Sequence, residues 1–140
     1  MLIGEYTYII DDKKRLAIPS KMRSELGKKA ILTRGLDNCL VLYPLKEWQN
    51  LSKKMAALPA GQVDARGFTR VVLSGAIEVS LDKLGRILVP DHLKKYAFLK
   101  KNVAVIGVSN RVEIWDEARW KEYKGKMEKT VGDMAQQIGI

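Results

Sequence analysis

The sequence has very few of the residues that build disulfides, metal sites and membrane spans. Its 140 residues include one cysteine, Cys39, and one histidine, His92. A single thiol cannot form an internal disulfide and fits a reducing cytoplasm, and these counts exclude a Cys/His zinc site. No apolar run approaches the ~20 residues of a membrane span, and no basic segment precedes an apolar stretch at the N-terminus. We therefore expect a soluble, cytoplasmic protein with no metal, no cofactor, no membrane contact and no small-molecule substrate.

Acidic residues are also in deficit. The chain has 25 Lys and Arg against 16 Asp and Glu, and its formal net charge of +9 is typical of nucleic-acid binders. Eight basic residues and one acidic residue lie between Lys13 and Arg34, and six basic residues and one acidic residue lie between Lys83 and Lys101. The net positive charge of these two segments together exceeds the net charge of the whole chain, so the rest of the chain is slightly acidic. The charge is therefore concentrated in two patches.

The two patches belong to an internal repeat. A shift of 71 residues aligns Gly4 with Gly75, Asp11 with Asp82, Arg15 with Arg86 and Pro19 with Pro90. A shift of 72 aligns Gly35 with Gly107, Asn38 with Asn110 and Trp48 with Trp120. The apolar positions follow the same shifts. The sequence therefore predicts two copies of a unit of about 45 residues.

Both copies predict the same order of elements. Alternating apolar residues indicate strands over 6–10 and 77–81, which are followed by turns at 11–14 and 82–85 and by short strands over 15–18 and 86–89. Pro19 and Pro90 then begin short helices, and hairpins follow over 30–43 and 103–115. Amphipathic helices are expected over 45–58 and 120–138, with a connecting helix over 62–73. No low-complexity linker separates the copies, so we expect them to pack into one α+β body.

The repeated Asp-x-x-x-Arg motif, Asp11 to Arg15 and Asp82 to Arg86, lies across a predicted hairpin turn. In one interpretation it is structural, because an Asp at a turn accepts backbone N–H groups and pairs with the Arg. In the other, the Asp positions an Arg at the tip of a ribbon that fits the ~12 Å major groove, where Arg is the usual partner of guanine. Spacing alone leaves both open. The lysines beside Arg15 favour phosphate binding.

Other candidate residues carry less weight. Trp48 and Trp120 lie among aliphatic residues at helical spacing, which favours core or oligomer contacts over base stacking. Cys39 opens a predicted strand and is interpreted as a small apolar filler. His92 is expected at the surface of a short helix. No glycine-rich phosphate loop of standard spacing is present.

These motifs, read in order, resemble the MraZ family of bacterial transcriptional regulators. The resemblance covers nearly the whole chain and rests on segments 4–6, 10–19, 32–37, 42–48, 81–90 and 113–116. It implies two tandem AbrB-like swapped-hairpin units in one pseudo-twofold body, with an amphipathic helix after each unit. It also implies a ring-shaped homo-oligomer, for which we take eight subunits, and repression through short G-rich direct repeats upstream of the division and cell-wall gene cluster, including the regulator's own operon.

The expected organisation follows from the repeat and the resemblance together. Residues 5–47 form the first DNA-binding repeat, 48–75 the linking helices, 76–119 the second repeat and 120–140 the C-terminal helix. The expected DNA-binding residues are Arg15, Arg86, Lys13, Lys14, Lys83, Lys21 and Arg23, and the two residues that hold the turns are Asp11 and Asp82. The partners are double-stranded DNA and other copies of the chain, which implies association with the nucleoid.

One departure between the copies affects this expectation. Lys14 stands where the second copy has Gly85, and glycine adopts a positive φ freely whereas lysine does not. We therefore expect the two turns to differ in geometry and the first copy to dominate DNA affinity. Two other functions stay open: an AbrB-like antitoxin or RNA-binding module, and, with least support, an enzyme that uses carboxylates.

Overall fold

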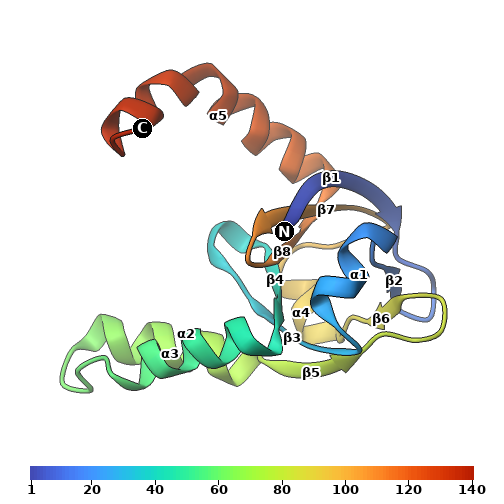
Figure 1. Ribbon diagram of the computed structural model, residues 1–140, viewed down its shortest axis with the longest axis horizontal. Coiled ribbons are helices and arrows are strands. Elements are labelled where there is room, and N and C mark those ends of the chain that lie inside the picture. Colours follow the sequence, from blue (N-terminus) through green and yellow to red (C-terminus); the bar gives the residue numbers. More distant parts are fainter.

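The computed structural model describes residues 1–140 as eight strands, five α-helices and one short 3₁₀ helix (Figure 1). The first repeat contains β1 (Leu2–Ile9), β2 (Arg15–Ala17), α1 (Ser20–Leu26), β3 (Lys29–Arg34), η1 (Leu36–Asn38), β4 (Leu40–Pro44) and α2 (Leu45–Ala56). Helix α3 (Val63–Gly75) links it to the second. That repeat contains β5 (Ile77–Ser80), β6 (Arg86–Leu88), α4 (Asp91–Tyr96), β7 (Asn102–Ser109), β8 (Val112–Asp116) and α5 (Glu117–Gln137). The mixed α+β class and the repeated order of elements are thus confirmed.

The two repeats exchange their first strands. Six strands form one antiparallel sheet in the order β1-β7-β8-β4-β3-β5, so β1 of the first repeat pairs with β7 of the second and β5 of the second pairs with β3 of the first. The order is symmetric, because replacing each strand by its counterpart in the other repeat reverses it. Neither repeat can therefore complete its part of the sheet alone.

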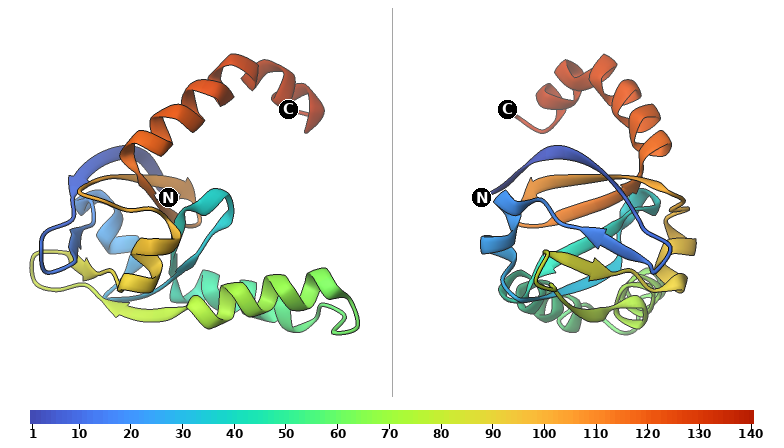
Figure 2. Two further views of the ribbon diagram at one scale, coloured as in Figure 1. Left: turned by 180° about the vertical axis from the view of Figure 1, so that it is seen from behind. Right: turned by 90° about the vertical axis from the view of Figure 1, so that its right-hand side faces the viewer.

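Strands β2 and β6 form a separate two-stranded antiparallel ribbon (Figure 2). Leu16 lies opposite Ile87 at its centre, and both side chains are buried against the sheet. This pairing corrects one sequence-based prediction: the strands on either side of each motif turn pair with strands of the opposite repeat and not with each other. The turn therefore joins the sheet to the ribbon and is not the tip of a local hairpin.

The main core lies between the six-stranded sheet and the layer formed by the ribbon, α1 and α4. Equivalent residues of the two repeats meet there, since period-two strands and helical i, i+4 spacing turn one side of each element inward. The most deeply buried members are Leu16, Ile18, Met22, Leu32, Leu40, Leu42, Ile87, Val89, Leu93, Val103 and Ile114. Gly27 is the C-cap of α1 and has φ 77°, a positive value that glycine adopts freely.

A smaller cluster covers the opposite face of the sheet. It contains Cys39, Val41, Ala104, Ile106 and Trp115, with Trp120 and Tyr123 of α5 packed on top. Helix α5 is fixed at its start by Asp116, which accepts a hydrogen bond from the backbone N–H of Arg119 at 3.1 Å. Cys39 is buried, which fits its interpretation as a small filler.

The helices that follow each repeat extend away from the ribbon. In Figures 1 and 2, α5 and the α2–α3 pair project on the side of the body opposite the β2–β6 turns. Helix α5 runs without interruption through Gly125 and Gly132 and contains no buried residue. No helix in the structure is both long and apolar enough to cross a membrane.

Burial of the ribbon centre provides a test of the fold. Leu16 is 0% exposed, so Leu16→Ala removes buried apolar contacts and leaves a cavity, and we expect a loss of about 2 to 5 kcal/mol in the free energy of unfolding. The measurement is urea denaturation followed by circular dichroism. Leu84→Ala is the matched control, because Leu84 is 63% exposed and its loss should change stability by less than about 0.5 kcal/mol. Equal losses would contradict this packing.

Candidate nucleic-acid interface

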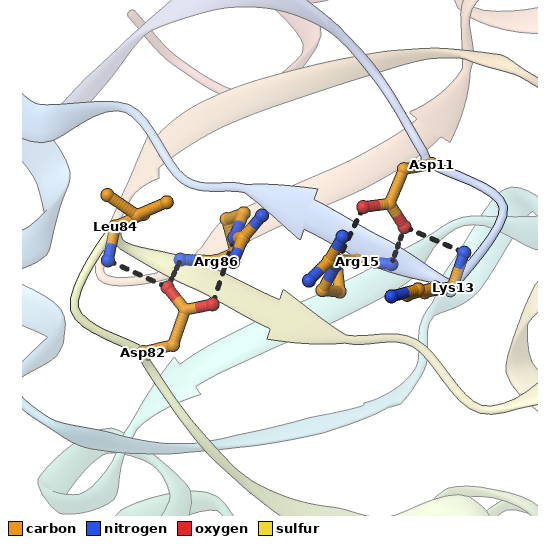
Figure 3. Close-up of polar contacts among 6 residues, drawn as sticks. All are labelled: Asp11, Lys13, Arg15, Asp82, Leu84 and Arg86. Atoms are coloured by element: carbon orange, nitrogen blue, oxygen red, sulfur yellow. Dashed lines mark hydrogen bonds and ion pairs between the residues drawn. The ribbon is translucent and has the colours of Figure 1, made fainter.

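The first Asp-x-x-x-Arg motif is held by one carboxylate that binds both a turn and a guanidinium. Asp11 Oδ1 accepts the backbone N–H groups of Lys13 and Arg15, each at 2.9 Å. Its second oxygen, Oδ2, accepts Arg15 Nε at 2.7 Å (Figure 3). The Asp therefore closes the turn and fixes the direction of the Arg side chain at the same time.

The second motif repeats this arrangement atom for atom. Asp82 Oδ1 accepts the backbone N–H groups of Leu84 and Arg86, each at 2.9 Å, and Asp82 Oδ2 accepts Arg86 Nε at 2.9 Å. The interpretation of the motif as a turn that positions its Arg agrees with both copies. The ion pairs are partly exposed to solvent, and such pairs contribute little to stability by themselves.

The two turns have the same backbone conformation. Lys14 has φ 63° and Gly85 has φ 73°, and in each turn this residue donates its backbone N–H to the motif Asp carbonyl, at 3.0 and 2.9 Å. The expectation that Lys14 would change the turn geometry is therefore wrong. The carboxylate bonds and the inter-repeat backbone bonds impose the left-handed conformation in spite of its cost for lysine.

Both motif arginines project from one face of the ribbon. Arg15 lies opposite Leu88, and Arg86 lies opposite Ala17, so these four residues alternate with the buried Leu16 and Ile87. Figure 3 shows the two guanidinium groups on neighbouring strands, with their Asp partners at opposite ends. Nε of each Arg donates to its Asp, and neither Nη atom donates a hydrogen bond within the protein. The Nη donors of both partly exposed arginines are therefore free to bind a ligand.

The predicted phosphate-binding residues divide into two groups. Lys13, Lys83 and Lys21 are exposed and their ammonium groups have no acidic partner. Lys14 differs, because its Nζ lies 2.8 Å from Asp91 Oδ2 of the opposite repeat. Arg23 is half-buried in α1, where its Nε donates to the backbone carbonyl of Ile18 at 2.9 Å.

Hydrogen bonding lowers the pKa of both motif carboxyls. For Asp11 the largest cause is the backbone N–H of Arg15, followed among the favourable contacts by the Arg15 side chain. For Asp82 the largest cause is the backbone N–H of Arg86. Both groups are therefore anions at neutral pH, and each keeps its Arg oriented.

Two features of the site were missed in the sequence. Asp91 binds Lys14 across the repeat boundary, and the Arg23 guanidinium lies where a side chain at Gly85 would be. The repeat alignment contains a signal for both, because the copies differ at these positions: Lys14 aligns with Gly85, and Ser20 aligns with Asp91. His92, expected at the surface, is exposed, with Nε2 3.3 Å from the Gly75 carbonyl oxygen.

Comparison with known proteins agrees with the internal repeat. The model of one protein family, described as "MraZ protein, putative antitoxin-like", matches residues 1–71 and again residues 72–136. This chain belongs to the MraZ family. The two MraZ matches divide the chain after residue 71, in agreement with the 71-residue shift that aligns the motifs.

Individual MraZ relatives cover almost the entire chain. The protein named "Transcriptional regulator MraZ" from Caldanaerobacter subterraneus subsp. tengcongensis is 49% identical over 99% of this chain and 96% of its own length. Its namesake from Acetivibrio thermocellus is 48% identical over 100% of this chain and 98% of its own length. That from Moorella thermoacetica is 53% identical over 88% and 86%.

The shared carboxylate geometry of this MraZ chain predicts a specific response to acid. Asp11 and Asp82 have folded-state pKa values below the ordinary 3.8, so their contribution to stability is complete above that pH and is lost as pH falls through the folded value. We expect Asp11→Asn to destabilise the protein at pH 7, and we expect the difference in free energy of unfolding between this variant and the parent to narrow below pH 3.8. Denaturant unfolding across pH measures this difference. The control variant is Asp133→Asn, because Asp133 is exposed and unpaired. A difference in unfolding free energy between Asp11→Asn and the parent that stays constant down to pH 2 would contradict the lowered pKa of Asp11.

Proposed function

We propose that this protein is a DNA-binding transcriptional regulator that acts as a repressor through its β2–β6 ribbon. The observation that carries the proposal is the pair of motif arginines on one partly exposed ribbon face, each with free Nη donors and an ionised Asp that fixes its direction. A two-stranded ribbon fits the major groove, where an Arg fork binds guanine O6 and N7. The relatives' name, "Transcriptional regulator MraZ", supports this role.

The register of the ribbon suggests how the arginines divide the DNA between them. Arg15 and Arg86 are diagonal neighbours across the antiparallel pair, for which a separation of about 7 to 8 Å is usual. At about 3.4 Å per base pair, this spans roughly two base pairs. The two arginines thus read one short element as a unit, with Lys13, Lys83 and Lys21 on the flanking phosphates.

The finer parts of the proposal follow from membership of the family. The operator consists of short G-rich direct repeats upstream of the division and cell-wall gene cluster, including the promoter of the protein's own operon. Each repeat of the chain is an AbrB-like swapped hairpin, and the exchange of β1 and β5 between the repeats supports this assignment. A protein with this role is cytoplasmic and associated with the nucleoid.

Substitution of the motif arginines tests base recognition. We expect Arg15→Ala and Arg86→Ala each to weaken operator binding by about 1 to 3 kcal/mol and to relax base preference. Lys13→Ala is the matched control: it should weaken operator and unrelated duplexes alike and lower the salt slope by about 1. Fluorescence titration at several salt concentrations measures both. Operator binding by folded Arg15→Ala as tight as that of the parent would refute recognition through the ribbon.

A second candidate function rests on the family description, which includes the word antitoxin. An AbrB-like antitoxin or an RNA-binding module could use the same cationic ribbon. Filter binding with duplex DNA and with RNA of the same sequence separates these functions from the proposed one. Tighter binding to the RNA would favour the alternative.

Assembly is the other part of the proposal. Phe68, Val71 and Leu73 of α3 are 40%, 46% and 43% exposed, and Val131 of α5 is 60% exposed. Between these helices, the second face of the sheet borders a cavity of about 530 Å³, whose lining includes Tyr43, Phe68, Trp115, Trp120 and Tyr123. We propose that these apolar surfaces join copies into a ring of eight subunits that presents many ribbons at once.

Multivalent binding predicts a dependence on operator spacing. A ring that engages several repeats can gain about 10² to 10⁴ in avidity, provided the repeats recur near one helical turn of about 10 base pairs. Inserting five base pairs between two repeats should therefore abolish this gain in a gel-shift titration, whereas inserting ten should restore much of it. Native mass spectrometry of the free protein gives the subunit count. Equal affinity for all three spacings, or a free monomer, would argue against the ring.

A further inference from the structure

The two motif turns contact the opposite repeat through equivalent backbone bonds but unlike side chains. Val89 N–H donates to the Lys14 carbonyl at 2.9 Å, and Ile18 N–H donates to the Gly85 carbonyl at the same distance. The first turn thereby lies against the segment that leads into α4, and the second against the segment that leads into α1. The backbone is symmetric here, so any functional difference must come from the side chains.

At the first turn, the positive charge of Lys14 is neutralised. Lys14 Nζ lies 2.8 Å from Asp91 Oδ2, and this hydrogen bond is the main cause that lowers the pKa of Asp91. Asp12, in the same turn, adds a second exposed acid. A phosphate at this position would have to displace an existing carboxylate.

At the second turn, the missing side chain of Gly85 makes room for a cation. A Cβ at Gly85 would overlap the Arg23 guanidinium, so only glycine allows Arg23 to lie against the turn. Arg23 Nε is fixed by the Ile18 carbonyl at 2.9 Å, and its Nη atoms have no hydrogen-bond partner in the protein. The guanidinium is therefore positioned but not neutralised.

Arg23 shares a shallow depression with two lysines. Lys28 and Lys83 line it together with Ser24 and Gly27. Asp82 is the one acid on its lining, and both of its oxygens are already occupied by the second turn and Arg86. In the repeat alignment, Lys83 replaces Asp12, and Lys28 stands where the second repeat has Leu99. Three cations without an available acid thus line the depression at the second turn, whereas the equivalent positions at the first turn hold Lys94, Leu99 and Asp12.

We propose that this depression, formed by Arg23, Lys28 and Lys83 beside Gly85, binds a DNA backbone phosphate and sets the direction in which the ribbon lies along the duplex. The inference rests on the proposed DNA-binding function. A ribbon with two equivalent arginines can enter the groove in either direction with equal energy. Unequal phosphate contacts at the two turns, with this depression at the second and Lys13 at the first, remove that equality. Every subunit then reads its repeat in the same direction, as an operator of direct repeats requires.

Matched substitutions at equivalent positions test the phosphate site. Arg23→Gln should lower the slope of log K against log salt by about 1, because one phosphate contact releases about one counterion. Lys94→Gln alters the equivalent residue of α4 and should leave the slope unchanged. Arg23→Gln also removes the hydrogen bond to Ile18 and could impair folding, so Lys28→Gln and Lys83→Gln, at exposed positions, provide a second test. Each of these two variants should also lower the slope. Equal slope changes on the two sides would overturn the asymmetry.

A tethered cleavage reagent tests the direction. Burial raises the pKa of the Cys39 thiol, so an exposed thiol introduced as Ser24→Cys can be coupled selectively to iron–EDTA. On a duplex with one operator repeat, we expect cleavage on one flank from Ser24→Cys and on the other flank from Lys95→Cys, the equivalent position of the second repeat. Equal cleavage of both flanks by each variant, with binding intact, would refute the directional role alone. Absence of duplex binding by the parent would instead refute the proposed function.

Discussion

The structure depends on the exchange of β1 and β5 between the two repeats. Each of these strands completes the sheet of the other repeat, because β1 pairs only with β7 and β5 only with β3. Backbone N–H and C=O groups of both repeats are satisfied only when the repeats interlock. The same exchange brings β2 beside β6, and the burial of Leu16 against Ile87 holds that ribbon on the body.

The ribbon brings two motifs that are distant in the sequence together on one surface. Each motif Asp uses one oxygen for its turn and the other for its Arg, so the local chain fixes the direction of each guanidinium. The strand pairing then sets the spacing between Arg15 and Arg86. Local hydrogen bonds therefore determine how each Arg points, and long-range pairing determines what the two arginines can reach together.

Near-symmetry of the backbone coexists with unequal side chains around the ribbon. Lys14 adopts the same left-handed conformation as Gly85, since the surrounding hydrogen bonds over-determine the turn. Because Gly85 has no side chain, the Arg23 guanidinium can lie against the second turn, whereas Lys14 in the first turn forms an ion pair with Asp91. Two differences between the copies are enough to leave Arg23 without an acidic partner at the second turn and to pair Lys14 with Asp91 at the first.

The sequence by itself determined the repeat, which shows as residue identities at a shift of 71. It also determined the order of elements, the turn chemistry of Asp11 and Asp82, and the hairpins β3–β4 and β7–β8, because each of these depends on residues close together in the chain. The tertiary structure decided which strands pair across the repeats, and so corrected the expected hairpins around the motif turns. It also decided the contacts of Lys14 with Asp91 and of Arg23 with Gly85. These contacts join residues from opposite repeats, and no local pattern encodes them, since they form only when the exchanged strands bring the two turns against α1 and α4.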